Sequence, residues 1–302
     1  GPLPEPRLRE LMSKRVLGYL NWRLHRGGAM RPAVLDGLVA DLRAHQPDHV
    51  CVTGDIVNIA LDAELEPARQ WLSELGAPTQ VSLVPGNHDA YVKGALKRAS
   101  AVWGAHLFGD GFDHAKFPYV RRRGPVALIG ASSAYATGPF MATGRMDASQ
   151  ALLLSEALQH AGKEGLFRVV MIHHPPTIGS AHWAGRLIGA DRFRAAVREA
   201  GAELVLHGHT HQRSLDWIEG RDGAVPVLGV PSASASPGLG RVGATWNRID
   251  IDGAPGRWTI NLTERGYRTP GGTIETIDER VIGPPGDGVT LNRATRKSRR
   301  RL

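Results

Sequence analysis

Apolar runs rich in β-branched residues alternate with helical patterns between residues 31 and 206 of this chain. The predicted strands are His49–Asp55, Gln80–Val84, Val126–Ala131, Phe167–Ile172 and Glu203–Leu206. The predicted helices are Arg31–His45, Glu64–Leu75, Ala148–Ala161 and Arg192–Ala200. Such alternation is typical of α/β architectures, in which helices cover the faces of a sheet. We therefore predict an α/β fold.

The pattern changes after Gly208. Strand-like pieces at Val225–Val230, Trp246–Ile251 and Trp258–Leu262 are joined by glycine and proline, which predicts antiparallel β structure. Residues 269–288 are rich in glycine and proline without a clear period, which indicates an extended segment. We predict one domain over residues 1–268, and an extended segment with a basic tail over residues 269–302.

The chain is basic, with 37 Lys and Arg against 29 Asp and Glu and a formal net charge of +8. This balance favours anionic partners such as nucleotides, phospholipid surfaces or nucleic acid. Part of the excess lies in one block that has no acidic residue: Arg293, Arg296, Lys297, Arg299, Arg300 and Arg301. A like-charge block is typical of a solvated tail, and contact with a membrane or nucleic acid is the alternative.

The composition excludes two classes of protein. A single cysteine, Cys51, cannot form a disulfide framework and fits a reducing compartment. No apolar run approaches the roughly 18 residues of a membrane-spanning helix, and no three-part signal peptide is visible. We expect a cytoplasmic protein, with peripheral contact with an anionic membrane as the alternative.

The segment Leu8–Arg26 has the pattern of an amphipathic helix. Its apolar residues recur at spacings of three and four, which places them on one helix face: Leu8, Leu11, Met12, Val16, Leu20 and Leu24. Its cationic residues are Lys14, Arg15, Arg23 and Arg26. We expect this helix to pack on the core. The alternative is a helix that faces the substrate or an anionic membrane.

Two polar motifs follow predicted strands, where open α/β sheets place their sites. Asp55 in Gly54–Asn58 can offer one carboxylate oxygen to each of two cations, and the preceding glycine leaves room for close approach. In the motif Gly86-Asn87-His88-Asp89, the Asn87 carbonyl can coordinate a metal and His88 can exchange a proton near neutral pH. Asp89 could hold the imidazole in one tautomer or raise its pKa. A polar turn is the alternative for each motif.

Five of the 13 histidines crowd two further strand ends: His173, His174, His207, His209 and His211. In an extended His-x-His triplet, His209 and His211 point to the same side and can converge on one metal cluster. Core histidines are the alternative, although unpaired buried imidazoles are costly.

The order Gly-Asp-x-x-Asn, Gly-Asn-His-Asp, His-His-Pro-Pro, Gly-His-Thr-His between Val50 and His211 resembles the calcineurin-like metallophosphoesterases. The resemblance implies a two-sheet β-sandwich flanked by helices. It also implies hydrolysis of phosphodiester or pyrophosphate bonds by a metal-bound hydroxide at a dinuclear centre. Oxygen ligands mixed with imidazoles suit Mn, Fe or Zn.

The resemblance also assigns roles to single residues. The implied metal ligands are Asp55 as the bridge, Asn87, His173 and His209 at one ion, and His211 at the other. His173 is preferred to His174 because the family's ligand precedes proline by two positions. His88 would stabilise the phosphoryl oxygens or protonate the leaving group, with Asp89 behind it.

One motif of the family is not found in these residues. The family carries Asp-x-His at the end of its first strand, and no Asp here is followed two positions later by His. We expect this first strand immediately upstream of Gly1. One metal site then keeps all its ligands within residues 1–302, while the other keeps Asp55 and His211. We expect the chain to bind one metal more readily than two.

Several substrates fit this resemblance. A cyclic-nucleotide-type phosphodiesterase is the first prediction. The segment Ser13–Trp22 is similar to family members that cleave UDP-2,3-diacylglucosamine in lipid A synthesis, because a basic amphipathic entrance suits a lipid-linked pyrophosphate. A non-catalytic binding scaffold is the alternative from another class, although a scaffold has no need of this ligand set. An enzyme of nucleic acid is the third alternative, motivated by the charge.

Overall fold

The computed structural model describes residues 3–26, 31–238 and 242–283. The basic block from Arg293 to Arg301 and the end of the Gly/Pro-rich segment lie outside these described residues. Within the three ranges, the structure contains no helix that is both long enough and apolar enough to cross a bilayer.

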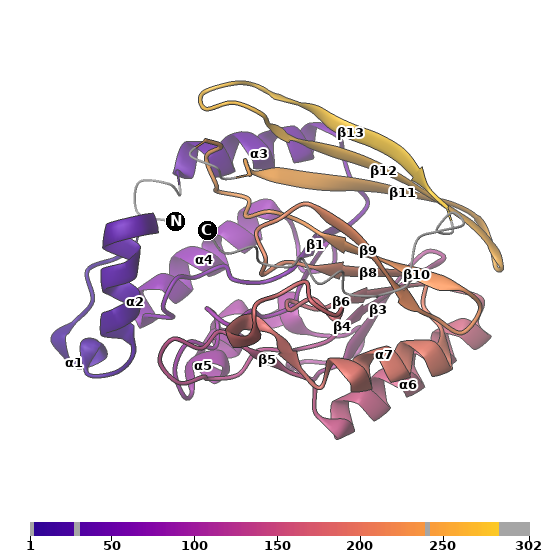
Figure 1. Cartoon of the computed structure of the whole chain (residues 1–302), viewed down its shortest axis with the longest axis horizontal. Helices are drawn as coiled ribbons and strands as arrows, with labels where there is room; N and C mark the ends of the chain where they lie inside the picture. Colours follow the sequence, from indigo (N-terminus) through magenta and orange to yellow (C-terminus); the bar gives the residue numbers. More distant parts are fainter. Residues whose placement is uncertain (1–2, 27–30, 239–241, 284–302) are drawn as a thin grey trace, which may run out of the picture.

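A six-stranded sheet with the order β3-β4-β6-β8-β10-β9 forms the centre of the molecule (Figure 1). Its strands are β3 (Tyr119–Arg123), β4 (Val126–Gly130), β6 (Phe167–Met171), β8 (Leu204–His207), β10 (Ala224–Gly229) and β9 (Ser214–Glu219). The four inner strands run parallel, while β3 and β9 pair antiparallel at the two edges. Helices α6 (Ala148–Lys163) and α7 (Ala190–Ala200) pack on one face, over Ile129, Val170 and Val205.

A second layer packs on the opposite face and consists of two smaller sheets, β1-β2 and β11-β12-β13. Their strands are β1 (Val50–Val52), β2 (Val81–Leu83), β11 (Thr245–Ala254), β12 (Arg257–Tyr267) and β13 (Ile274–Ile282). Leu128 and Val169 of the central sheet share a core with Ile260 and Leu262 of β12.

Three helices cover this second layer from outside. Helices α4 (Asp62–Leu75) and α5 (Ala95–Trp103) share a core with β2, and α3 (Pro32–Ala44) contacts β11 and β13 (Figure 1). The predicted two-sheet sandwich flanked by helices is therefore confirmed. It differs in one respect. The second layer consists of two separate sheets, and β1 and β11 are edge strands of these two sheets.

The remaining elements are short. They are α1 (Leu8–Leu11), α2 (Arg15–Asn21), the π-helix η1 (Trp22–Arg26), the 3₁₀ helices η2 (Gly104–Leu107) and η3 (Trp183–Gly185), and the paired strands β5 (Gly144–Arg145) and β7 (Leu187–Ile188).

The segment predicted to be extended after residue 268 contains a strand. Residues Ile274–Ile282 form β13, which pairs antiparallel with β12 over most of its length. Charged residues interrupt its apolar pattern, so the strand is not evident from the sequence. The sheet therefore continues beyond the predicted boundary at residue 268.

The N-terminal segment also differs from its prediction. It is divided into α1, α2 and η1, and the residues of the predicted apolar stripe other than Leu11 are exposed. The side chains that turn inward are Arg15, whose Nε donates to the Ile59 carbonyl at 3.0 Å, and Tyr19 and Trp22, which pack on Ile59 and Leu61. A buried arginine that hydrogen-bonds to carbonyls fixes the rotation of the helix, and helical periodicity does not reveal it.

Candidate metal centre

Asp55 lies in a tight turn directly after β1. Gly54 has a φ of +100° and Asp55 a φ of +59°, and the side chain of Asp55 is 16% exposed. A Cβ on Gly54 would lie 2.7 Å from the Gly86 amide nitrogen, and a Cβ on Gly86 would lie 2.1 Å from Asp55 Oδ1. Both glycines are therefore required for the Asp55 loop and the Asn87 loop to approach each other.

Asp89 holds this turn in place. Its fully buried carboxylate accepts hydrogen bonds from the amides of Asp55 (2.9 Å), Ile56 (3.0 Å), Val57 (3.3 Å) and Gly86 (2.7 Å). Burial and the nearby Asp55 raise the pKa of Asp89 to about 7. Two amides on each oxygen nevertheless leave no lone pair for a proton, so we treat the group as a carboxylate.

The predicted contact of Asp89 with the His88 imidazole is therefore wrong. The Asp89 oxygens accept four backbone amides, which leaves no lone pair for a hydrogen bond from that ring. The His88 ring instead hydrogen-bonds through Nδ1 to the Asn58 carbonyl, and its backbone amide donates to Asp55 Oδ1 at 2.8 Å. Asp89 positions the Asp55 turn rather than tuning His88.

Four predicted ligands, each from a different loop, come together beside this turn. Asn87 Oδ1 lies 3.0 Å from His209 Nδ1 and 3.2 Å from His173 Nε2, and Asp55 Oδ2 lies 3.2 Å from the same His173 nitrogen. The His173 Nδ1–H donates to the Thr53 carbonyl at 2.6 Å, which leaves Nε2 turned toward the oxygens. The second nitrogen of His173 thus has a fixed orientation, as a metal-binding imidazole requires.

The electrostatics of this cluster couple its members. Burial would raise the pKa of Asp55, but the neighbouring His173 and His88 hold it well below its usual range. Burial would lower the pKa of His173, but the nearby Asp55 carboxylate outweighs this effect and raises the pKa above its usual value. For His209, burial and His173 lower the pKa to about 4, so its imidazole is neutral and available as a ligand at neutral pH.

The donor set fits a metal ion. A carboxylate oxygen, an amide oxygen and two imidazole nitrogens converge here, and there are fewer hydrogen-bond donors than acceptors among them. A bound cation would relieve the repulsion between the lone pairs of these atoms. Mixed oxygen and imidazole ligands suit Mn, Fe or Zn.

His174 lies near the cluster but has other partners. Its ligand atoms, with those of His173 and His209, lie within 4.8 Å of one another. However, Nε2 contacts the Ala142 carbonyl at 3.0 Å and Nδ1 contacts Ser133 Oγ at 2.7 Å, so both nitrogens are used. This geometry supports the choice of His173 as the ligand.

The His-x-His triplet is not extended, contrary to the prediction. His209 and His211 have φ values of +64° and +54°, and the Thr210 amide donates to the Gly208 carbonyl at 2.7 Å. This tight turn follows β8 directly and replaces the extended backbone on which the prediction rested. His211 lines the same cavity as Asp55 but is not a member of the 4.8 Å histidine cluster.

Two residues of the site were missed by the sequence. Glu64 accepts the amides of Asn58 (2.6 Å), Ile59 (3.1 Å) and Leu61 (2.9 Å), and so supports the carbonyl that holds His88. An acidic residue three positions after the start of a helix was the available signal. Tyr91 stacks on His88 with ring centroids 5.8 Å apart, and only the fold reveals this contact.

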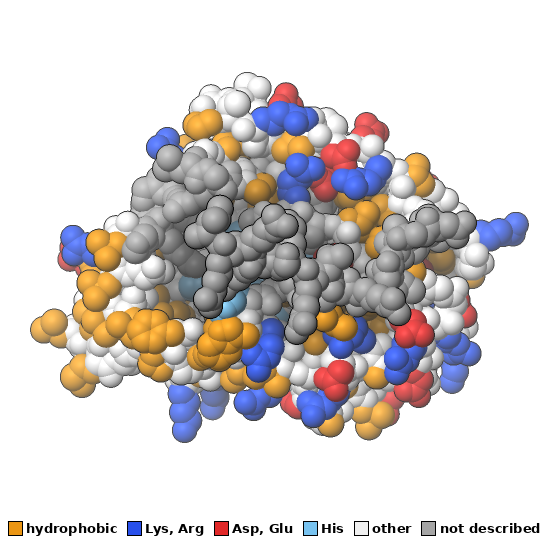
Figure 2. Space-filling view, viewed as in Figure 1, with side chains coloured by type: hydrophobic (Ala, Val, Ile, Leu, Met, Phe, Trp, Pro, Cys, Tyr) orange, Lys and Arg blue, Asp and Glu red, His pale blue; other side chains and the backbone are white. Residues whose placement is uncertain are grey.

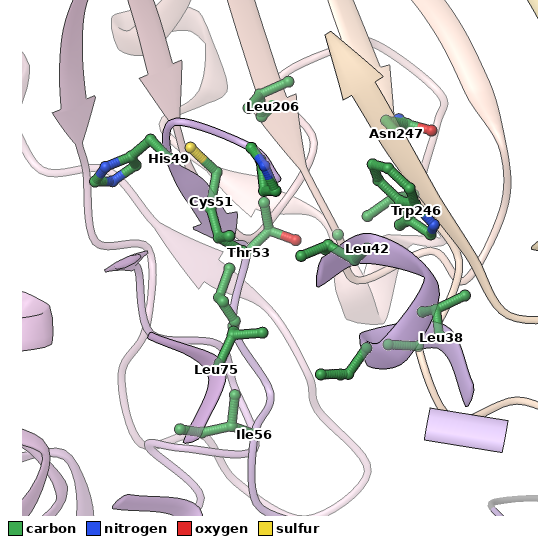
Figure 3. Close-up of a pocket in the computed structure, with 18 of the residues that line it drawn as sticks. Leu38, Leu42, His49, Cys51, Thr53, Ile56, Leu75, Leu206, Trp246 and Asn247 are labelled. Carbon is green, nitrogen blue, oxygen red and sulfur yellow. The ribbon is translucent and has the colours of Figure 1, made fainter. Parts of the chain in front are cut away.

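The cluster opens into a cavity of about 1690 Å³. Its walls include Leu38 and Leu42 of α3, Cys51 of β1, Leu206 of β8 and Trp246 of β11 (Figure 3). The cavity lies between β1 and β11, which are edge strands of the two smaller sheets. The site therefore combines a polar end with largely apolar walls.

Comparison with known proteins also points to a phosphoesterase. A family model for calcineurin-like phosphoesterases matches residues 31–213. A probable cyclic nucleotide phosphodiesterase from Synechococcus sp. is 26% identical over 226 residues, which cover 74% of this chain and 78% of that protein.

Two solved structures match this chain. A dimetal phosphatase from Danio rerio has a TM-score of 0.50 and 13% identity, and the match covers 80% of this chain and 88% of that one. The sulfate thiohydrolase SoxB from Thermus thermophilus has a TM-score of 0.44 and 16% identity, with coverage of 83% of this chain and 42% of SoxB. This chain thus spans less than half of SoxB.

Proposed function

Because the chain belongs to the calcineurin-like phosphoesterase family, we propose that it is a phosphodiesterase acting on small diesters of the cyclic-nucleotide type. In this proposal Asp55, Asn87, His173 and His209 hold one metal ion, and Asp55 with His211 contributes to a second. The observation that supports it most is that the side chains of Asp55, Asn87, His173 and His209 converge, with contacts of 3.0–3.2 Å between their oxygen and nitrogen atoms. The similarity to a probable cyclic nucleotide phosphodiesterase supports the substrate class.

The residues divide the chemistry among them. Bound metal ions would supply Lewis acidity, a more acidic water and compensation of developing charge. His88 lines the cavity, and its Nδ1–H is committed to the Asn58 carbonyl, which sets the tautomer of the ring. In the proposal His88 contacts a phosphoryl oxygen or the leaving group, while Tyr91 and Glu64 keep the ring in position.

A substrate panel tests this proposal. We expect turnover of bis(p-nitrophenyl) phosphate and of 3′,5′-cyclic nucleotides in the presence of Mn²⁺. A UDP-linked acylated sugar is the second candidate, favoured by the apolar walls of the cavity. Turnover of none of these compounds by protein that holds two metal ions, with the fold intact, would instead favour a binding scaffold.

His88→Gln is expected to lower turnover of bis(p-nitrophenyl) phosphate by about 10²–10⁴-fold, as for loss of a proton-donating contact in the transition state. The metal content should not change, because His88 is not among the proposed ligands. His160→Gln, on an exposed histidine of α6, is the control and should retain full activity. Equal activity of both variants would remove His88 from the proposed mechanism.

The second metal site needs ligands besides Asp55 and His211. Among the described residues, β1 and β11 each have a hydrogen-bonded neighbour on one side, and the cavity lies between them. An extended strand seated there would join the two smaller sheets into one. A strand parallel to β1 would end beside Asp55. We propose that such a strand carries the Asp-x-His motif of the family.

Residues 1–302 alone are expected to retain one Mn²⁺ or Zn²⁺ per chain after dialysis, as measured by elemental analysis. Asn87→Ala should reduce this content, because it removes an oxygen ligand from the more complete site. Asn247→Ala is the control, because Asn247 lies on β11 in the wall of the cavity and is not among the proposed ligands (Figure 3). Two tightly held ions per chain would show that other residues complete the second site.

A further inference from the structure

The N-terminal arm, defined here as residues 7–24, exposes an apolar surface. Five residues of the predicted stripe lie here with large exposed fractions: Leu8 86%, Met12 85%, Leu24 75%, Leu20 50% and Val16 38%. Leu17, outside the predicted stripe, is also 38% exposed. These side chains gather at the end of the molecule where α1 and α2 lie (Figure 2). A group of exposed apolar residues at one end of a molecule is unusual for a surface in contact with water alone.

The rotation of the arm is fixed by its inner face. Arg15 donates to the carbonyls of Ile59 and Ala60, and Tyr19 packs on Ile59. A Cβ on Gly18 would lie 2.4 Å from the Tyr91 hydroxyl, so the helix approaches the body closely. The arm therefore cannot turn its leucines inward without breaking these buried contacts.

The charge of the arm complements an anionic surface. Residues 7–24 contain five basic residues and one acidic residue, Glu10. Arg7, Arg9 and Arg23 are exposed. An amphipathic helix with cationic residues beside an exposed apolar face is suited to the interface of an anionic bilayer.

Contacts of the arm lead toward the metal centre. Lys14 Nζ donates to Thr137 Oγ1 at 2.9 Å and lies 4.3 Å from the centre of the Tyr91 ring, which stacks on His88. The loop that contains Thr137 carries Phe140, which is 86% exposed. The arm, this loop and the candidate site are thus linked by direct contacts.

We propose that the N-terminal arm docks on the surface of an anionic lipid bilayer, with Leu20 and Leu24 in the acyl region and Arg9 and Arg23 at the headgroups. This interaction places the metal centre close to the membrane. It does not depend on the proposed phosphodiesterase activity, because docking uses residues outside the candidate metal centre.

Vesicle sedimentation tests the proposal with the whole chain. We expect binding to vesicles of phosphatidylglycerol and phosphatidylcholine mixed in equal parts, and much weaker binding to phosphatidylcholine alone. The double variant Leu20→Glu/Leu24→Glu should bind the mixed vesicles at least about tenfold more weakly, because two apolar anchors are replaced by like charges. Leu152→Glu/Leu153→Glu, on exposed leucines of α6, makes the same change in charge and should bind normally.

Further measurements check the folding of the variants and distinguish a bilayer from other binding partners of this surface. Circular dichroism and turnover of bis(p-nitrophenyl) phosphate should be equal in both double variants, and Leu8→Glu/Met12→Glu provides a second arm variant if the first does not fold. Equal binding of the two double variants would overturn the proposal, as would loss of binding only on removal of Arg293–Leu302. A dimer in light scattering that Leu20→Glu/Leu24→Glu disperses would assign the surface to a second copy of the chain, and would also overturn it.

Discussion

Asp55→Asn is expected to lower turnover of bis(p-nitrophenyl) phosphate by about 10³-fold, which corresponds to about 4 kcal/mol of lost transition-state stabilisation. Asn offers one neutral oxygen where Asp55 offers two charged ones, so it cannot serve two cations. The fold should survive, because an Asn oxygen can still accept the His88 amide that now donates to Asp55 Oδ1 at 2.8 Å. Turnover at saturating Mn²⁺, together with the melting temperature, measures the two effects separately.

The matched control is Asp62→Asn, on an exposed aspartate at the start of α4 that pairs with Arg98. This variant should retain full turnover and metal content. If Asp55→Asn also retained both, Asp55 would not be the bridging ligand and the proposed centre would have to be rebuilt around other residues.

Asp89→Asn is expected to lower the free energy of unfolding by about 2–6 kcal/mol. Its amide group would face two of the four backbone N–H groups that Asp89 now accepts, and each buried donor left without a partner costs about 1–3 kcal/mol. Activity should fall with stability, because the turn that carries Asp55 loses its support. Urea unfolding in the absence of metal measures the stability.

Asp216→Asn is the control for this experiment. Asp216 lies on β9 and is half-buried, and burial raises its pKa, but it accepts none of these amides. Its replacement should change the free energy of unfolding by no more than about 0.5 kcal/mol. Comparable losses in Asp89→Asn and Asp216→Asn would show that burial of the carboxylate, rather than its four hydrogen bonds, determines the effect.

The prediction of a metal-dependent phosphoester hydrolase is confirmed at the level of the family. The cyclic-nucleotide substrate, the identity of the metal and the cytoplasmic location stay predictions. So do the roles of the individual ligands, although the structure brings Asp55, Asn87, His173 and His209 together as the resemblance implies.

The sequence could predict much of the site because its ligands follow strands. Asp55, Asn87, His173 and His209 each come shortly after a strand of the sandwich: β1, β2, β6 and β8. Parallel strands bring their carboxyl ends to the same edge of a sheet, which accounts for Asp55 with Asn87 after β1 and β2, and for His173 with His209 after β6 and β8. That the two pairs form one centre was implied by the resemblance to the family.

Other features could not be predicted because they depend on rotation or on backbone turns. The outward rotation of the arm follows from the hydrogen bonds that Arg15 makes to a loop more than 40 positions away. The turn at His209 and His211 follows from positive φ angles, which a His-x-His pattern does not encode.

The sequence by itself determined the α/β class, the family and the types of donor atom, because these depend on local runs of residues and on short motifs. Only the tertiary structure decided which nitrogen of His173 faces the cluster, which groups Asp89 holds and which face of the arm meets water. Each of these depends on a contact between segments far apart in the chain: Thr53 with His173, Asp89 with residues 55–57, and Arg15 with Ile59. Such contacts exist only after the layers have packed, so no local pattern carries them.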